Sequence, residues 1–351
     1  MSHLFETLTP DVMLAALEAT GLLLDGRLMT LSSYENRVVM AHTEDGAAVV
    51  AKFYRPQRWS DAQIQEEHDF AAQLAEAEIP LAAPMVFNGQ TLHHAQGFRY
   101  SISPRKGGRT PELDDLDTLE WIGRFLARMH TVGATAPFAV RPALNVASFG
   151  TEPYDWLVQH ASVAPEVSTA WRGACQEALA LVAACAGRTL AGGHSSSATS
   201  STASSATEVE GIQHIRLHGD CHPGNILWTP EGSTTQAAGP HFVDLDDART
   251  GPAVQDLWML LSGDRRQRTQ QLSAILDGYA QFRSFDRREL ALIEPLRTLR
   301  LLHYSAWLAR RWDDPAFPLA FPHFGTRAYW QEQLQLLQAQ IEAMQEEPLV
   351  V

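Results

Sequence analysis

Two polar segments, one after the other along the chain, constrain this sequence more than any other feature. The first, His218–Asn225, contains Asp220 and ends at Asn225, with four residues between the two. The second, Phe242–Asp247, begins as an apolar run that predicts a strand, so the Asp244 carboxylate would project from a strand end. Phosphoryl transfer from a nucleotide requires an acid that orients a hydroxyl, and oxygen ligands that hold magnesium. The two segments supply these groups and predict a phosphotransferase.

Length and charge narrow the class of protein. The chain has 351 residues, which favours two lobes over one core, and its net charge of -14 argues against a nucleic-acid-binding protein. Its three cysteines are too few for a disulfide scaffold, so we expect reduced thiols and a cytoplasmic location. The N-terminus lacks the pattern of a signal peptide, and no apolar run approaches the ~20 residues of a membrane span.

The predicted elements divide the chain into an α+β fold with a small β-rich N-terminal part and a larger helical part. Strands are expected at 28–31, 37–42, 47–54, 85–87 and 98–104, with a helix over 61–77. Beyond residue 115 most segments show helical spacing, and short strands at 213–217, 226–228 and 242–245 carry the polar motif. The Ser-rich stretch 190–210 lacks apolar periodicity and is predicted to be a disordered insertion.

Asp220 is the candidate proton acceptor. It follows a predicted strand and precedes Pro223-Gly224, in a loop that a rigid scaffold would hold. An Asx-turn is the simpler explanation for Asp220 alone. A zinc site built from His218, Cys221 and His222 is a weaker alternative, because adjacent Cys and His residues cannot easily ligate one ion. Ser-His-Asp catalysis is disfavoured, since no Gly-x-Ser-x-Gly elbow is present.

Asn225 and Asp244 are the candidate magnesium ligands, because magnesium prefers hard oxygen donors. Asp246 and Asp247 complicate the choice, since three acids within four residues repel one another unless a cation lies between them. Strand alternation would place Asp244 and Asp246 on one side and Asp247 on the other. We therefore assign the metal to Asp244, leave Asp246 as a neighbouring or substrate-side acid, and expect Arg249 to neutralise part of the cluster.

Lys52 is the candidate phosphate-binding cation. It lies in Val49–Phe53, which resembles the strand that carries the phosphate-binding lysine of kinases. The helix that follows offers Glu66 and Glu67 as ion-pair partners, and the register to Leu74 favours Glu67. An edge lysine in solvent is the alternative. The loop between the first two strands, with Ser32 and Ser33, falls where a phosphate-covering loop would lie but contains no glycine.

The motifs together resemble the aminoglycoside phosphotransferase and choline kinase group, which has the protein-kinase fold. Within that group the likeness is closest to bacterial stress response kinases and extends over nearly the whole chain except 190–210. It is carried by five stretches: Leu31–Val38, Lys52–Pro56, Leu217–His222, Phe242–Arg249 and Gly251–Trp258.

This resemblance implies a bilobal protein-kinase-like fold, with a nucleotide-binding lobe over 1–104 and a catalytic and substrate lobe over 105–351. It also implies a monomeric, cytoplasmic serine/threonine protein kinase that uses ATP and Mg²⁺ and acts in a stress response. The roles it implies are proton acceptor for Asp220, magnesium ligands for Asn225 and Asp244, and a nucleotide-loop role for Ser33. Relative to the family pattern, residues 229–240 are expected to bulge outward.

Two other functions remain open from the sequence. A small-molecule kinase acting on an amino alcohol, a sugar or an aminoglycoside would suit an acidic groove, and Asp246 and Asp247 hint at one. A non-catalytic nucleotide-binding regulator is disfavoured by the intact set of four residues, Lys52, Asp220, Asn225 and Asp244. Asp256 is interpreted as a structural residue that braces the catalytic loop.

Overall fold

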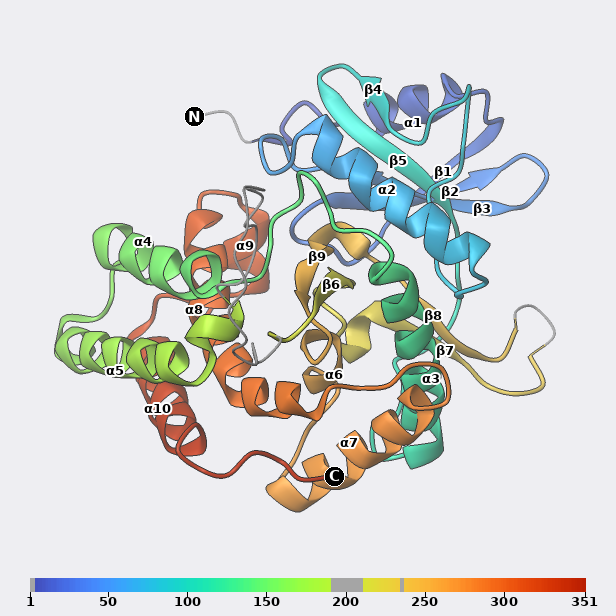
Figure 1. Ribbon diagram of the computed structural model, residues 1–351. Coiled ribbons are helices and arrows are strands. Elements are labelled where there is room, and N and C mark those ends of the chain that lie inside the picture. The colour runs from blue at the N-terminus through green and yellow to red at the C-terminus, as the bar shows by residue number, and fades with distance from the viewer. Residues whose placement is uncertain (1–3, 191–210, 234–236) are drawn as a thin grey trace, which may run out of the picture.

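The computed structural model describes residues 4–190, 211–233 and 237–351. The chain forms two lobes (Figure 1): a sheet with two helices in the N-terminal part, and a larger helical body that follows it. The α+β, bilobal fold predicted from the sequence is confirmed. The predicted Ser-rich insertion lies almost wholly outside the described residues.

An antiparallel sheet forms the N-terminal lobe. Its strands are β1 (Leu24–Thr30), β2 (Arg37–Thr43), β3 (Ala48–Phe53), β4 (His93–Ala95) and β5 (Phe98–Pro104), in the order β1-β2-β3-β5-β4. Alternate residues of β3, such as Val49, Ala51 and Phe53, are buried in the core of this lobe. The intervening Lys52 therefore projects from the opposite face of the sheet.

Helix α1 (Pro10–Glu18) packs against the sheet, and α2 (Asp61–Glu76) crosses toward the C-terminal lobe. A capping box between Ser60 and Gln63 begins α2. Its buried face is shared between the lobes, because Ile64 packs near Tyr54 whereas Phe70 and Leu74 join the large C-terminal core. This sharing fixes α2 relative to both lobes.

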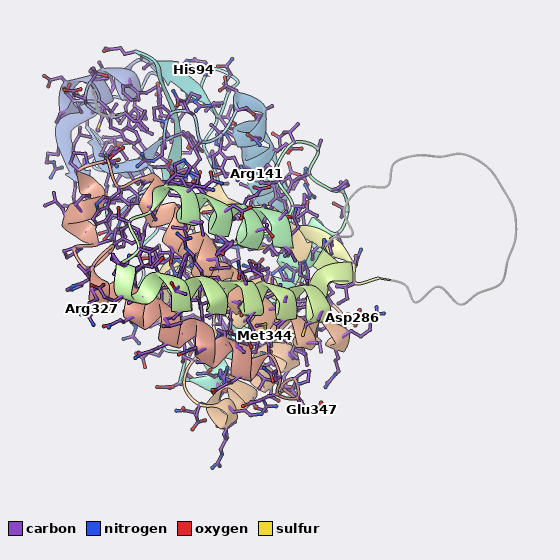
Figure 2. All side chains as sticks on the ribbon, turned by 90° about the vertical axis from the view of Figure 1, so that its left-hand side faces the viewer. His94, Arg141, Asp286, Arg327, Met344 and Glu347 are labelled. Atoms are coloured by element: carbon purple, nitrogen blue, oxygen red, sulfur yellow. The ribbon has the colours of Figure 1, made fainter. Side chains whose placement is uncertain are left out.

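Helices build most of the C-terminal lobe. They are α3 (Leu116–Gly133), α4 (Glu152–His160), α5 (Pro165–Leu190), α6 (Gln255–Trp258), α7 (Arg265–Tyr279), α8 (Ile293–Arg310), α9 (Ala316–Ala320) and α10 (Arg327–Ala343). Two glycines allow α3 and α7 to pack closely, since a Cβ at Gly123 would lie 2.1 Å from the Ile275 carbonyl oxygen and one at Gly278 would lie 2.0 Å from that of Glu120. Figure 2 shows the side of the C-terminal lobe that carries α4, α5 and α10, with Arg327 at the start of α10 and Met344 just after its end.

Two short antiparallel strand pairs lie between the helices and the N-terminal lobe. They are β6 (His214–Leu217) with β9 (Arg249–Pro252), and β7 (Ile226–Thr229) with β8 (Gly239–Phe242). The turns between these strands carry the polar motif, so it lies where the two lobes meet (Figure 1). The expected outward bulge over 229–240 falls partly on residues outside those described.

Most elements lie close to their predicted places, but strand β9 was not predicted, and the strand expected at 242–245 instead ends at Phe242. The strand predicted at 85–87 is wrong: Phe87 forms only an isolated bridge with Gln90, and β4 at His93–Ala95 pairs with β5 instead. A Met85-Val86-Phe87 run is apolar enough for a strand, but Val86 is exposed. Helix α9 was not predicted. Within the described residues, no helix combines the length and apolarity needed to cross a membrane.

Candidate active site

Two cavities meet between the lobes. The inner cavity, about 340 Å³, lies under β2 and β3 and is lined by Lys52, Glu67 and several apolar side chains. The outer cavity, about 420 Å³, is lined by Asp220, Arg300 and the aromatic residues of α8. Five residues line both cavities: Ser32, Ser33, Gly224, Asn225 and Asp244. A group bound in one cavity therefore meets a group bound in the other at these residues.

The inner cavity has apolar walls from both lobes. Val38 and Val50 line it from the N-terminal sheet, and Leu227 and Phe242 line it from the strand pair β7–β8. Two facing apolar walls suit a flat, aromatic ring system. The polar end of the cavity, with Lys52, suits an anionic group.

Lys52 lies at the centre of an acidic cluster. Its Nζ is 3.1 Å from Glu67 Oε1, and 3.3 Å from both Asp246 Oδ1 and Asp244 Oδ1. Burial opposes the charged form, but the Asp246 and Glu67 carboxylates hold the pKa of Lys52 well above its ordinary value. The side chain is therefore a permanent cation at the polar end of the inner cavity.

The structure separates the two adjacent glutamates of α2. Glu67 is buried and pairs with Lys52, as the register to Leu74 favours. Glu66 points elsewhere: its carboxylate accepts backbone N–H groups from Val140 and Arg141 at 3.0 and 2.8 Å. Glu66 thus holds a loop of the C-terminal lobe against α2.

Asp220 lies at the base of the outer cavity, with its side chain 23% exposed. Arg300 Nη1 donates to Asp220 Oδ1 at 2.6 Å, and His222 Nε2 lies 3.6 Å from Oδ2. The neighbouring Cys221 is fully buried, whereas His222 lines the cavity. These two side chains face different environments, which disfavours the zinc alternative.

Backbone contacts hold the loop that carries Asp220. Asp256, fully buried, accepts the N–H groups of His218 and Gly219, both at 2.8 Å. Gly219 has φ +84, and a Cβ there would lie 2.2 Å from the Asp247 carbonyl oxygen, so only glycine fits. His218 Nε2 contacts the Val243 carbonyl at 3.0 Å and links the two motif segments. The bracing role expected of Asp256 is present, and His218 contributes to it.

Asn225 and Asp244 offer oxygen donors at the junction of the cavities. The Asn225 amide donates its N–H to the Asp220 carbonyl at 2.9 Å, which leaves its carbonyl oxygen for a cation. Asp244 adopts the left-handed conformation, φ 61 and ψ 67, and its side chain is 48% exposed. A carboxylate and an amide oxygen fit a hard divalent cation together with phosphate oxygens.

The strand expected through Asp246 and Asp247 is wrong, but the grouping it predicted holds, because Asp244 and Asp246 both contact Lys52 whereas Asp247 contacts Arg58 and Arg249. Residues Leu245–Asp247 form a 3₁₀ turn, so the period of two does not apply. Asp246 is buried and pairs with Arg58 as well as Lys52, and the Asn36 amide donates to it at 3.2 Å. Burial alone would raise the pKa of Asp246, but the two cations hold it below its ordinary value.

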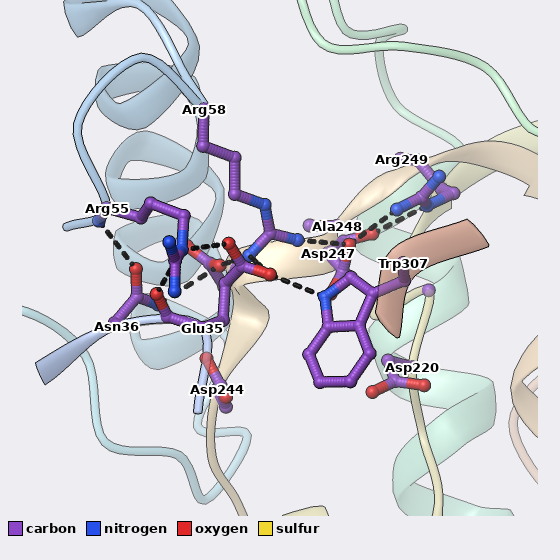
Figure 3. Close-up of polar contacts among 12 residues, drawn as sticks. Glu35, Asn36, Arg55, Arg58, Asp220, Asp244, Asp247, Ala248, Arg249 and Trp307 are labelled. Atoms are coloured by element: carbon purple, nitrogen blue, oxygen red, sulfur yellow. Dashed lines mark hydrogen bonds and ion pairs between the residues drawn. The ribbon is translucent and has the colours of Figure 1, made fainter. Parts of the chain in front are cut away.

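Asp247 is neutralised in the same way. It lies 2.8 Å from Arg58 Nη2 and 2.6 Å from Arg249 Nη2 (Figure 3). The expectation that Arg249 neutralises part of the cluster is confirmed, but Arg58 has the larger share because it contacts both acids. Neither Asp246 nor Asp247 is left as a free anion for a cationic acceptor.

The loop over the cavities is tied to the C-terminal lobe through Glu35. Figure 3 shows its carboxylate between Arg55 and the Trp307 indole, which donates to Oε2 at 2.5 Å. Arg311 Nε lies 2.6 Å from the same oxygen. Ser33, two residues before Glu35, lines both cavities. Side-chain contacts thus hold in place a loop that has no glycines.

Three arginines of the site were not predicted: Arg58, Arg141 and Arg300. Arg141, fully buried, donates to the Ala248 carbonyl at 2.6 Å and to the Gln63 carbonyl at 2.9 Å, which ties α2 to the turn after Asp247. Arg300 had a weak signal, since residues 300, 304 and 307 place Arg, Tyr and Trp on one helical face. Arg58 and Arg141 lie in loops, where no periodicity marks them.

The family follows from these features and from comparison with known proteins. Residues 28–293 match the phosphotransferase enzyme family, and the chain belongs to that family. It is 44% identical over 345 residues to "Serine/threonine protein kinase RdoA" of Salmonella typhimurium, covering 98% of this chain and 96% of the relative. It is also 44% identical over 346 residues to "Stress response kinase A" of Escherichia coli K12, with the same coverage.

Solved structures agree on the fold. An amicoumacin kinase, solved in complex with AMP-PNP, Ca²⁺ and Ami, aligns with a TM-score of 0.68 at 17% identity, covering 97% of this chain and 95% of the other. A microcompartment-associated aminopropanol kinase aligns with a TM-score of 0.64, also at 17% identity, covering 94% and 95%. At these identities the likeness shows a shared fold and does not extend to the acceptor.

Proposed function

We propose that this chain is an ATP- and Mg²⁺-dependent serine/threonine protein kinase of the cytoplasm that acts in a stress response. One observation carries the proposal: Asp220 and Lys52 lie in separate cavities that meet at Ser33, Asn225 and Asp244. A nucleotide in the inner cavity would present its terminal phosphate to an acceptor in the outer cavity. The names of the full-length relatives support a protein as the acceptor.

Each site residue takes one role in this proposal. Lys52, held by Glu67, binds the nucleotide phosphates, and Ser33 lies over them. Asn225 and Asp244 would hold Mg²⁺, which supplies charge neutralisation on the phosphates when bound. Asp220 accepts a hydrogen bond from the acceptor hydroxyl and aligns its oxygen with the γ-phosphorus.

The reaction then balances as follows. The acceptor oxygen forms a bond to the γ-phosphorus, and the bond from that phosphorus to the β–γ bridging oxygen breaks. ADP leaves with the bridging oxygen, and the hydroxyl proton passes to the Asp220 carboxylate. Alignment and charge supply most of the rate, because the protein forms no covalent bond to the phosphoryl group.

Each lobe has its own role in this proposal. Residues 1–104 form the nucleotide-binding lobe and residues 105–351 the catalytic and substrate lobe, with α2 packed against both cores. We take the protein to act as a monomer, with both cavities and the proposed site residues contributed by one copy of the chain.

The test is γ-labelled ATP with Mg²⁺ and a generic protein acceptor, for the wild type and Asp220→Ala. We expect label on serine or threonine, reduced by about 10²–10⁴ in the variant. Circular dichroism and nucleotide binding confirm that the variant is folded. Label that appears only on members of a small-molecule panel would replace the protein acceptor with a small one. ATP binding without transfer to any acceptor would indicate a nucleotide-binding regulator.

A further inference from the structure

One face of α8 forms a wall of the outer cavity. Arg300, His303, Tyr304 and Trp307 lie on it at helical spacing, and all four line the cavity. Tyr304 and Trp307 are stacked, with ring centroids 5.6 Å apart and an interplanar angle of 18°. This wall therefore consists of aromatic surface with one guanidinium next to Asp220.

Most charges around the outer cavity are already paired. Glu35, Asp246 and Asp247 each contact at least two cations. Asp244 is the proposed metal ligand. Asp220 and Arg300 are the remaining pair, so the charge that the cavity offers an incoming acceptor depends on these two.

His303 adds no charge to the wall. Burial, helped by Arg249, lowers the pKa of His303 to about 3, so its ring is neutral at physiological pH. The ring stacks on Phe149, with centroids 4.2 Å apart and an interplanar angle of 11°. On the α8 wall, among the described residues, Arg300 is the only cation that lines the cavity.

Arg300 has hydrogen-bonding capacity to spare. Its Nη1 donates to Asp220 Oδ1 at 2.6 Å, while the side chain remains 36% exposed. A guanidinium carries five N–H donors in a planar fork that matches a carboxylate or phosphate. One contact to Asp220 leaves most of that fork available within reach of the acceptor hydroxyl.

We propose that the outer cavity selects a serine or threonine flanked by an acidic residue, and that Arg300 is the specificity-determining residue that binds the acid. This inference rests on the proposed protein kinase activity. Arg300 touches both Asp220 and the acceptor's acid, so it places the hydroxyl beside Asp220. The stacked Tyr304 and Trp307 rings flank the peptide backbone. Asp246 and Asp247 do not attract a basic acceptor, because arginines already neutralise them.

The experiment compares matched peptides that differ only beside one serine: glutamate, alanine or lysine at the flanking positions. Wild type is expected to phosphorylate the glutamate peptide with a KM about tenfold or more below that of the lysine peptide, the size of a charge-assisted contact. Arg300→Ala should remove the difference mainly through KM. Arg300→Glu should reverse it, and Arg300→Lys should keep part of it.

A second measurement separates this inference from the proposed function. The same peptides with alanine in place of serine are titrated into the protein with a non-hydrolysable ATP analogue and Mg²⁺, and binding is followed by tryptophan fluorescence. Absence of transfer to every peptide would count against the kinase proposal alone, since binding still reports the acidic preference. Absence of that preference in binding would overturn the inference whether or not transfer occurs.

The control variant is Arg310→Ala, on the same helix but exposed and facing Trp156. It should retain the wild-type preference. A purely structural role for Arg300 would lower kcat equally for all peptides and leave the binding preference intact, which would also contradict the proposal. If Arg300→Ala does not fold, Arg300→Gln preserves the volume of the side chain without its charge.

Discussion

The contact between the lobes and the brace of the catalytic loop each bury an acid, but the partners differ. Asp246, 2% exposed, lies between Lys52 and Arg58, two long cationic side chains of the N-terminal lobe. Asp256, fully buried, accepts two backbone N–H groups of the catalytic loop and contacts His130 at 3.1 Å. Charged side chains therefore neutralise Asp246, whereas backbone N–H groups hold Asp256.

The two acids differ in whether another group can replace a lost hydrogen-bond or ion-pair partner. Around Asp246, Lys52 and Arg58 each contact more than one acid, and Asp246 contacts both cations, so a single loss is partly compensated. The backbone N–H groups of His218 and Gly219 both donate to Asp256, and they cannot move without moving Asp220. The lobe contact therefore tolerates change, whereas the brace does not.

Removal of the brace should give the largest loss of stability. Asp256→Ala leaves two backbone donors and His130 buried without their acceptor, which costs about 3–5 kcal/mol. The measurement is urea unfolding of the variant and the wild type. Asp256→Asn, which keeps one acceptor oxygen, is the matched control and should lose less. A loss below about 1 kcal/mol in Asp256→Ala would show that the brace is replaceable.

Glu289 is a third buried acid, and its protonation makes the stability of the protein depend on pH. Glu289 is buried and accepts the N–H of Val254, two residues before Asp256, at 2.8 Å. Unlike the acids of the lobe contact, Glu289 forms no ion pair with a described residue. Burial, opposed only in part by that hydrogen bond, raises the pKa of Glu289 to about 7 from an ordinary value of 4.5. The folded state therefore binds a proton more tightly than the unfolded state does.

The raised pKa of Glu289 determines the direction in which stability changes with pH. The stability contribution is complete below about pH 4.5 and is lost as pH rises through 7, with a total on the order of 3 kcal/mol. We expect the unfolding free energy of wild type to fall over this range relative to that of Glu289→Gln, which cannot ionise. Parallel pH profiles for the two proteins would contradict a raised pKa.

Loss of one acid from the outer part of the lobe contact should have the smallest effect. Asp314 lies 2.7 Å from Arg55 Nη2 and 3.1 Å from Arg37 Nη2, and Arg55 also pairs with Glu35. Asp314→Asn should therefore cost about 1 kcal/mol, and less in 1 M salt. Urea unfolding at low and high salt measures both. A loss equal to that of Asp256→Ala would remove the distinction between the two regions.

The sequence predicted best where a residue and its neighbours share one local element. Lys52 and Glu67 were paired correctly, because strand alternation and helical register fix both side chains. The bracing role of Asp256 followed from its place at a helix start. The positions of Asp220, Asn225 and Asp244 around one junction followed from their spacing along two short turns.

Prediction failed where a partner is remote or the backbone departs from a regular period. Arg58 meets Asp246 across 188 positions and Arg300 meets Asp220 across 80, and no local pattern encodes either contact. The strand expected through Asp246 and Asp247 was wrong, because the segment turns into a 3₁₀ helix after Asp244, whose φ is positive. The acidic cluster also suggested a basic acceptor, although arginines pair with both Asp246 and Asp247.

Nucleotide binding and phosphoryl transfer can be measured separately, and the proposed role of Asp220 concerns only the second. ATP affinity with Mg²⁺ and the rate of phosphoryl transfer are measured on the same samples of wild type, Asp220→Asn and Asp244→Asn. We predict that Asp220→Asn binds ATP within a few-fold of wild type and transfers about 10²–10⁴ more slowly. Asp244→Asn should also lose the Mg²⁺-dependent part of its ATP affinity. Transfer by Asp220→Asn at the wild-type rate would contradict the central claim.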